Sequence, residues 1–248
     1  MNQPLRWCPA TTTEGEPMTT LLTHRTAGRF IPTATDARRV LLTLPAFMTA
    51  LLLLLLPAMV SAYEAPTLAN VAGTRMDELL AGTRLTNVRG NGDVNRGEVI
   101  GILNAPANEL AVIIREYENI PLWSEALVVA NVISRTGNVQ IVEGETALPW
   151  PLTNRTWRIR SECSDRNVQG SDVWVNMWTH EPGYGNINNT YGYWMVYPLA
   201  SDPARSIVKY VVNADPALAL PDFVLNWVTN RVLPDLLDGL QARHETLY

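Results

Sequence analysis

The side chains that could support catalysis or metal binding are scattered along the sequence. Cys163 and His180 could form a nucleophile and its base, but the strand pairing that we expect sets them about 23 Å apart. Residues 91–97 resemble a calcium-binding loop, yet the glycine falls one position late and Ile102 stands where a glutamate ligand is needed. Glu143 and Glu145 could place two carboxylates on one strand face, but we expect both to be solvated surface charges. The sequence therefore predicts no catalytic residue, no metal site and no cofactor.

The composition is that of a folded, acidic protein. Of the 248 residues, 47% are hydrophobic and only 17% are charged, and the net charge is -5. Lys209 is the only lysine, so the chain cannot build a lysine-rich surface for phosphates. We therefore expect no nucleic-acid partner, and we expect a monomer.

The first 62 residues predict export. Residues 40–60 carry no charge, follow Arg38 and Arg39, and lead to Ser61 and Ala62, small residues of the kind found before a signal cleavage site. We interpret residues 39–62 as a signal peptide cut near Ala62, with a membrane anchor spanning residues 40–60 as the alternative. Residues 1–38 are a leader of unknown role, consistent with a translation start placed too far upstream. The remaining domain, residues 63–248, would then be periplasmic or secreted.

Cysteine usage fits a secreted domain without disulfides. Cys8 lies in the leader, so cleavage would leave Cys163 alone in the mature chain. A small buried hydrophobic side chain is the usual state of such a cysteine.

Hydrophobic periodicity indicates an α+β domain. A short helix at residues 74–81 precedes a hairpin at 85–103 that reverses near residues 90–93. Pro106 begins a second helix, in which Leu110, Ile113, Ile114 and Tyr117 share one face. Six strands follow at hairpin distances, which predicts a meandering antiparallel sheet: residues 126–134, 139–146, 156–164, 172–180, 191–197 and 206–213.

A long amphipathic helix ends the chain. Its apolar stripe includes Phe223, Trp227, Leu237 and Leu240, and Pro234 should distort it near the middle. Because a stripe this broad must be buried, we expect the helix to pack in the concave face of the sheet.

Four segments in this order resemble the START-type lipid-binding domain of the helix-grip (SRPBCC, Bet v 1-like) superfamily. They are the helix that ends at Trp123 (LNAPANELAVIIREYENIPLW), the proline-bracketed strand start at residues 147–160 (ALPWPLTNRTWRIR), the strand pair from residue 191 (YGYWMVYPLASDPARSIVKYVV), and the Asp-Pro, Leu-Pro and helix run that follows (NADPALALPDFVLNWV). The resemblance covers residues 74–244. Two positions depart from it: Thr156 stands where many members carry an acidic residue, and Ile187-Asn188 replaces a Val-Arg pair.

This resemblance implies a helix-grip fold, in which a curved antiparallel sheet wraps around the long C-terminal helix. It also implies a hydrophobic pocket between sheet and helix that holds one lipid, with transient membrane contact during transfer. The departures remove the basis for a buried ion pair and for a sterol ligand.

Hairpin register predicts which residues line that pocket. Reversals near residues 167–168 and 202–203 would pair Trp157 with Thr179, Ile159 with Met177, Tyr193 with Val212 and Met195 with Tyr210, and would point Lys209 away. Since a slip of one residue inverts a face, this prediction depends on the turns. The predicted lipid-binding residues are Trp157, Ile159, Val175, Met177, Tyr193, Met195, Tyr210, Phe223 and Trp227.

Two other functions remain open from the sequence. A helix-grip enzyme of the polyketide cyclase type would use Tyr193 or Tyr210 as acid or base, but no polar partner for either is visible in the sequence. A solid-core interaction domain would use the seven tryptophans after residue 62 only for packing. The pattern favours a lipid-binding or lipid-transfer protein over an enzyme.

Overall fold

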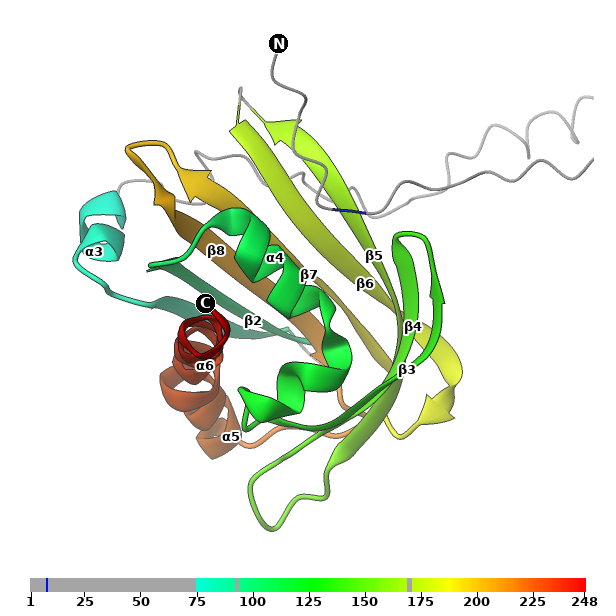
Figure 1. Cartoon of the computed structure of the whole chain (residues 1–248). Coiled ribbons are helices and arrows are strands. Elements are labelled where there is room, and N and C mark those ends of the chain that lie inside the picture. The colour runs from blue at the N-terminus through cyan, green and yellow to red at the C-terminus, as the bar shows by residue number, and fades with distance from the viewer. Residues whose placement is uncertain (1–7, 9–74, 92–93, 169–170) are drawn as a thin grey trace, which may run out of the picture. The chain divides into compact units, whose positions relative to one another are not determined.

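One antiparallel sheet of eight strands organises the domain (Figure 1). The computed structural model describes residue 8 and residues 75–91, 94–168 and 171–248. The sheet order is β1-β2-β8-β7-β6-β5-β4-β3, so the N-terminal hairpin joins the meander through the β2–β8 pair. The strands are β1 (Leu85–Asn91), β2 (Val94–Leu103), β3 (Leu127–Thr136), β4 (Val139–Thr146), β5 (Arg155–Val168), β6 (Ser171–Gly185), β7 (Asn189–Leu199) and β8 (Asp202–Asp215).

Helices cover the concave side of the sheet, which we call the inner face (Figure 1). Sheet residues on this face form one hydrophobic cluster with α4 and α6, whereas residues on the outer face form a second cluster with α3. The helical segments are α3 (Met76–Leu80), α4 (Ala107–Arg115), the 3₁₀ turn η2 (Tyr117–Leu122), α5 (Asp222–Trp227), the π turn η3 (Val228–Val232) and α6 (Leu233–Leu247).

The predicted fold class is confirmed. All six predicted strands of the meander form, the N-terminal hairpin forms, and a long C-terminal helix lies in the curve of the sheet. The predicted leader and signal segment, residues 1–62, lie outside the described residues except for Cys8. Within the described ranges, the helices are too short or too polar to cross a bilayer.

Helix α4 is shorter than the sequence predicts because Glu116 leaves helical geometry, with φ -81° and ψ 71°. The predicted face is nevertheless buried: Leu110 and Ile114 are fully covered, and Tyr117 packs with them from η2. Pro121 lies inside η2, where a 3₁₀ turn accommodates it.

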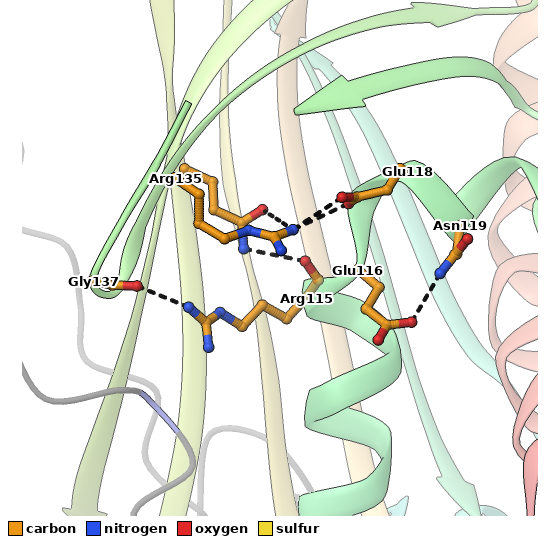
Figure 2. Close-up of polar contacts among 7 residues, drawn as sticks. Arg115, Glu116, Glu118, Asn119, Arg135 and Gly137 are labelled. Atoms are coloured by element: carbon orange, nitrogen blue, oxygen red, sulfur yellow. Dashed lines mark hydrogen bonds and ion pairs between the residues drawn. The ribbon is translucent and has the colours of Figure 1, made fainter. Parts of the chain in front are cut away.

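A set of polar contacts fixes the end of α4 to the β3–β4 hairpin (Figure 2). The Arg115 guanidinium donates to the Gly137 carbonyl at 2.9 Å, and the Gln140 amide donates to the Arg115 carbonyl at 3.2 Å. The Arg135 guanidinium pairs with the Glu118 carboxylate at 3.1 Å. These contacts hold η2, and therefore Trp123 at its end, against the inner face.

The predicted strand registers are wrong. Strand β5 extends to Val168 and pairs it with Ser171, so Ile159 lies opposite His180, not Met177. Tyr193 lies opposite Val211 and Met195 opposite Lys209, because a bulge at Pro198 and Leu199 displaces the β7–β8 turn from the position inferred from Asp202-Pro203. Each shift is an odd number of residues, and an odd shift moves one strand of a pair to the opposite face.

Candidate ligand-binding site

Aromatic rings form a continuous row across the middle of the inner face. Trp123 meets Trp194 edge-on with centroids 6.4 Å apart, Trp194 lies 4.5 Å from Tyr210, and Tyr210 stacks on Trp178 at 5.5 Å. Rings at these separations attract one another beyond the area they bury. The rings therefore form one continuous apolar surface on the inner face, which α6 approaches where Gly239 meets Trp123.

Two glycines give tryptophans of the inner face room to lie along the sheet. Gly144 pairs with Trp157, and Gly192 pairs with Trp178. A Cβ at either glycine would overlap the paired indole ring. The Trp157 ring is further fixed by its Nε1–H, which donates to the Thr146 hydroxyl at 2.9 Å.

The C-terminal helix closes the inner face and is widened in the middle. Val224 and Val228 are four residues apart, as are Leu233 and Leu237, but Val228 and Leu233 are five apart. A π turn places residues five apart on one face, so η3 aligns the apolar stripes of α5 and α6. The turn ends at Val232, two residues before Pro234, where the sequence predicts a distortion.

The α6 backbone packs tightly on the end of η2. At Gly239, a Cβ would overlap the Trp123 carbonyl oxygen, so only glycine allows this approach. Beside it, a recess with a free volume of about 20 Å³, enough for one water molecule, separates η3 from the start of β3. Its walls are Ser124, Glu125, Ala126, Trp227, Arg231, Val232, Asp235 and Leu236.

Several apolar residues that pack against the inner-face cluster remain only partly buried. They pack against the buried cluster from strands at both ends of the sheet and from η3 and α6. These partly buried residues are Val88, Leu127, Val132, Trp157, Tyr210, Val212, Val228 and Leu236. The recess itself has room for about one water molecule.

A ring of three hydrogen bonds lies deep in the same face. The Tyr117 hydroxyl donates to the Ser161 hydroxyl at 3.1 Å, Ser161 donates to Asn176 Oδ1 at 2.7 Å, and Asn176 Nδ2 donates to Tyr117 at 3.1 Å. Burial raises the pKa of Tyr117 to about 12, so this hydroxyl stays protonated. The ring provides buried polarity without charge.

The tyrosines proposed for the cyclase alternative do not form an acid–base pair. Burial raises the pKa of Tyr210, and the nearby Tyr117 raises it further. Burial also raises the pKa of Tyr193, which belongs to the outer-face cluster. A catalytic base requires a pKa near the working pH, and these shifts run in the opposite direction. Among the described residues, no group of three or more His, Cys, Asp or Glu side chains is placed to hold a metal ion.

The nine residues predicted to bind lipid separate into three groups. Trp157, Ile159 and Tyr210 belong to the inner-face cluster. Phe223 is 49% exposed, contrary to the expectation that it faces the sheet, and Trp227 lines the recess. The four on the outer face, where the register shifts place them, are Val175, Met177, Tyr193 and Met195.

Other inner-face residues were not among the predicted pocket residues. Trp123, Trp178 and Trp194 form the aromatic row, and Ser161 and Asn176 belong to the polar ring. The signal that could have identified Trp178 is the glycine at position 192, because a glycine opposite a tryptophan marks the face on which the ring lies. Ser161 and Asn176 carry no comparable signal.

Cys163 is buried, as predicted, but in the uncut chain it has a cysteine neighbour. The Cys8 backbone N–H donates to the Asp165 carboxylate at 3.2 Å, and Cys8 packs against the inner-face cluster that contains Cys163. A hydrogen bond from the Cys8 thiol lowers the pKa of Cys163 and raises that of Cys8. Both cysteines are free thiols.

Comparison with known proteins gives matches at the level of structure. No protein-family model and no curated protein matches the sequence. The STAR-related lipid transfer protein from Xanthomonas axonopodis superposes with a TM-score of 0.53 at 16% identity, over 66% of this chain and 98% of that one. Human StAR-related lipid transfer protein 5 superposes with a TM-score of 0.51 at 14% identity, over 69% of this chain and 92% of that one. A protein from Thermus thermophilus superposes with a TM-score of 0.50 at 16% identity, over 61% of this chain and 98% of that one. With its eight-stranded antiparallel sheet curved around a C-terminal helix, this chain has the START-type helix-grip fold.

Proposed function

We propose that this protein binds one lipid between the inner face of the sheet and the α5–η3–α6 segment, and transfers it between membranes. The observation that carries the proposal is the set of partly buried apolar residues on the inner face, which surround the aromatic row from both ends of the sheet. Burial of a lipid against them would be favourable by about 25 cal/mol per Å² of apolar surface. The fold supports the proposal, because two proteins of similar structure carry lipid transfer in their names.

Native mass spectrometry without detergent tests this proposal. The protein, as an exporting host processes it, should retain one lipid per chain. Val228→Arg places a charge among the inner-face residues and should abolish retention, whereas Phe223→Arg, on the exposed side of the same helical segment, should leave it intact. Circular dichroism confirms that both variants fold. An empty native protein that also takes up none of a panel of lipids would contradict the proposal and leave a solid-core domain.

We propose that the β4–β5 loop makes the transient membrane contact. Trp150 lies between two prolines in this loop and is 90% exposed, and an exposed tryptophan is suited to the lipid–water interface. Trp150→Ala should therefore slow lipid transfer between phosphatidylcholine vesicles several-fold without changing lipid affinity. Tyr248→Ala, which removes an exposed ring at the C-terminus, is the control and should transfer at the native rate.

We also propose that residues 39–62 export the domain and are removed near Ala62. Their charge pattern supports this proposal. N-terminal sequencing of the protein from the periplasm or medium should begin near Tyr63, and a chain that stays with the membrane fraction would favour the anchor instead.

A further inference from the structure

The strands at the centre of the inner face carry no charged side chain. Two neighbouring rows of paired residues cross it from β5 to β1, and neither contains an Asp, Glu, Lys, Arg or His side chain. The first row is Ser161, Trp178, Gly192, Val212, Gly97 and Val88, and the second is Cys163, Asn176, Trp194, Tyr210, Val99 and Thr86. A charged ligand group against these rows would lose its hydration, and the sheet would supply no counter-charge.

Two hydrogen-bond donors at this centre are nevertheless unpaired. Trp123 is 8% exposed, and its buried Nε1–H has no partner among the described residues. Among the described residues, the Tyr210 hydroxyl also makes no hydrogen bond, and its ring contacts Trp178 and Trp194. Trp123 and Tyr210 both contact Trp194, so the two rings lie on the same stretch of the aromatic row. An unpaired buried donor is costly, which makes it a specific recognition element when a ligand supplies the acceptor.

We propose that the bound lipid is uncharged and carries a carbonyl or ester oxygen, which accepts hydrogen bonds from Trp123 Nε1 and the Tyr210 hydroxyl. This inference rests on the proposed function, and it specifies the ligand class. The oxygen enters first, toward the aromatic row, and the hydrocarbon part contacts the partly buried apolar residues near η3. A lipid with a charged head group would have to leave that group outside.

Matched ligands separate the hydrogen bonds from hydrophobic burial. The probes are methyl palmitate, heptadecane and palmitate at pH 8, delivered from cyclodextrin, together with the polycyclic pair cholest-4-en-3-one and cholestane. The native protein should bind either the linear pair or the polycyclic pair. Within that pair, it should bind the oxygen-bearing ligand about tenfold more tightly than the hydrocarbon. Palmitate should bind more weakly than its methyl ester if acyl chains are accepted.

Tyr210→Phe removes only the hydroxyl and should reduce that preference several-fold while hydrocarbon affinity stays unchanged. Trp123→Phe should do the same. The matched control is Tyr197→Phe, because the Tyr197 hydroxyl likewise has no hydrogen-bond partner among the described residues but belongs to the outer-face cluster. It should keep the native preference.

Equal affinity for the oxygen-bearing ligand and its hydrocarbon would overturn this inference and leave the proposed function standing. Palmitate binding as tightly as its ester would also overturn it. Failure of all five probes to bind would contradict the proposed function itself, and the inference would fall with it.

Discussion

Lys209 is the charged residue most completely buried in the strands of this domain, and it is paired on the outer face. Its ammonium lies 3.0 Å from the Glu98 carboxylate, which also accepts from Arg96 at 3.1 Å. Burial raises the pKa of Glu98, but Lys209 and Arg96 outweigh burial and hold this pKa below its usual range. A carboxyl with a lowered pKa stabilises the fold above its unfolded-state pKa of about 4.3, and this contribution disappears as the pH falls through the folded-state pKa.

Lys209→Met should therefore destabilise the domain by about 2 kcal/mol at pH 7, because Glu98 remains buried with Arg96 alone. The loss should shrink on going from pH 6 toward pH 3, as Glu98 becomes protonated in native protein and variant alike. Urea unfolding across this range measures both effects. Arg160→Met breaks a pair whose side chains are each 42% exposed, and it should cost less than about 1 kcal/mol. A pH-independent loss in Lys209→Met would contradict the role of Glu98.

The positions of the strands could be predicted from the sequence, but the face on which each residue lies could not. Alternating hydrophobicity located the strands, but consecutive residues on both faces are buried in the middle of β6, β7 and β8, so the pattern could not tell the inner face from the outer one. Met195 and Tyr210 are equally plausible pocket residues in the sequence. Their separation depends on a bulge at Pro198 and Leu199, for which the sequence offers no clear marker.

At the scale of elements, the C-terminal helix illustrates what periodicity can and cannot predict. The helix, its apolar stripe and the distortion near Pro234 follow from residue types. The form of the distortion does not, because a spacing of five between Val228 and Leu233 is compatible with a kink, a break or a π turn. The structure selects the π turn, which keeps both stripes on the sheet.

This geometry predicts a coupled effect of two changes. Deleting exposed Asn230 shortens the Val228–Leu233 spacing to four, so a regular α-helix could keep the stripe aligned, but Pro234 would then clash within it. The deletion alone should cost about 3 kcal/mol, and deletion combined with Pro234→Ala should recover most of that loss. Thermal unfolding of the two single variants and the double variant measures the coupling. As a control, inserting an alanine after Asn230 should destabilise both the native protein and the Pro234→Ala variant. If the effects of the Asn230 deletion and of Pro234→Ala simply add in the double variant, the explanation is contradicted.

At the scale of the whole molecule, the proposed lipid would reach the inner face past the C-terminal segment. This segment meets the start of β3 through the exposed Arg231–Glu125 pair at 3.2 Å and through the small recess beside Trp227. A surface pair of this kind contributes less than about 1 kcal/mol, so it can open and close readily.

A reversible cross-link across this contact should block lipid uptake. Glu125→Cys and Arg231→Cys, joined by a short bis-methanethiosulfonate in a background with Cys8→Ser and Cys163→Ser, would prevent η3 from leaving β3. Fluorescent lipid uptake should fall at least tenfold and return when a thiol reductant releases the linker. Each single cysteine variant, treated in the same way, should take up lipid normally. Undiminished uptake in the cross-linked protein would place the opening elsewhere.

The proximity of Cys8 to Cys163 bears on compartments as well as on packing. If residues 39–62 act as the proposed signal segment, they would leave the residues before them on the side where synthesis occurs and carry the residues after them across the membrane. Under that proposal, the two thiols would meet only in a chain that has not been translocated. A disulfide-forming reagent applied to living cells, followed by trypsin digestion, should then link peptide 7–25 to peptide 161–166 in the precursor but not in the proposed exported form, so the pair would report on which side of the membrane the folded domain lay.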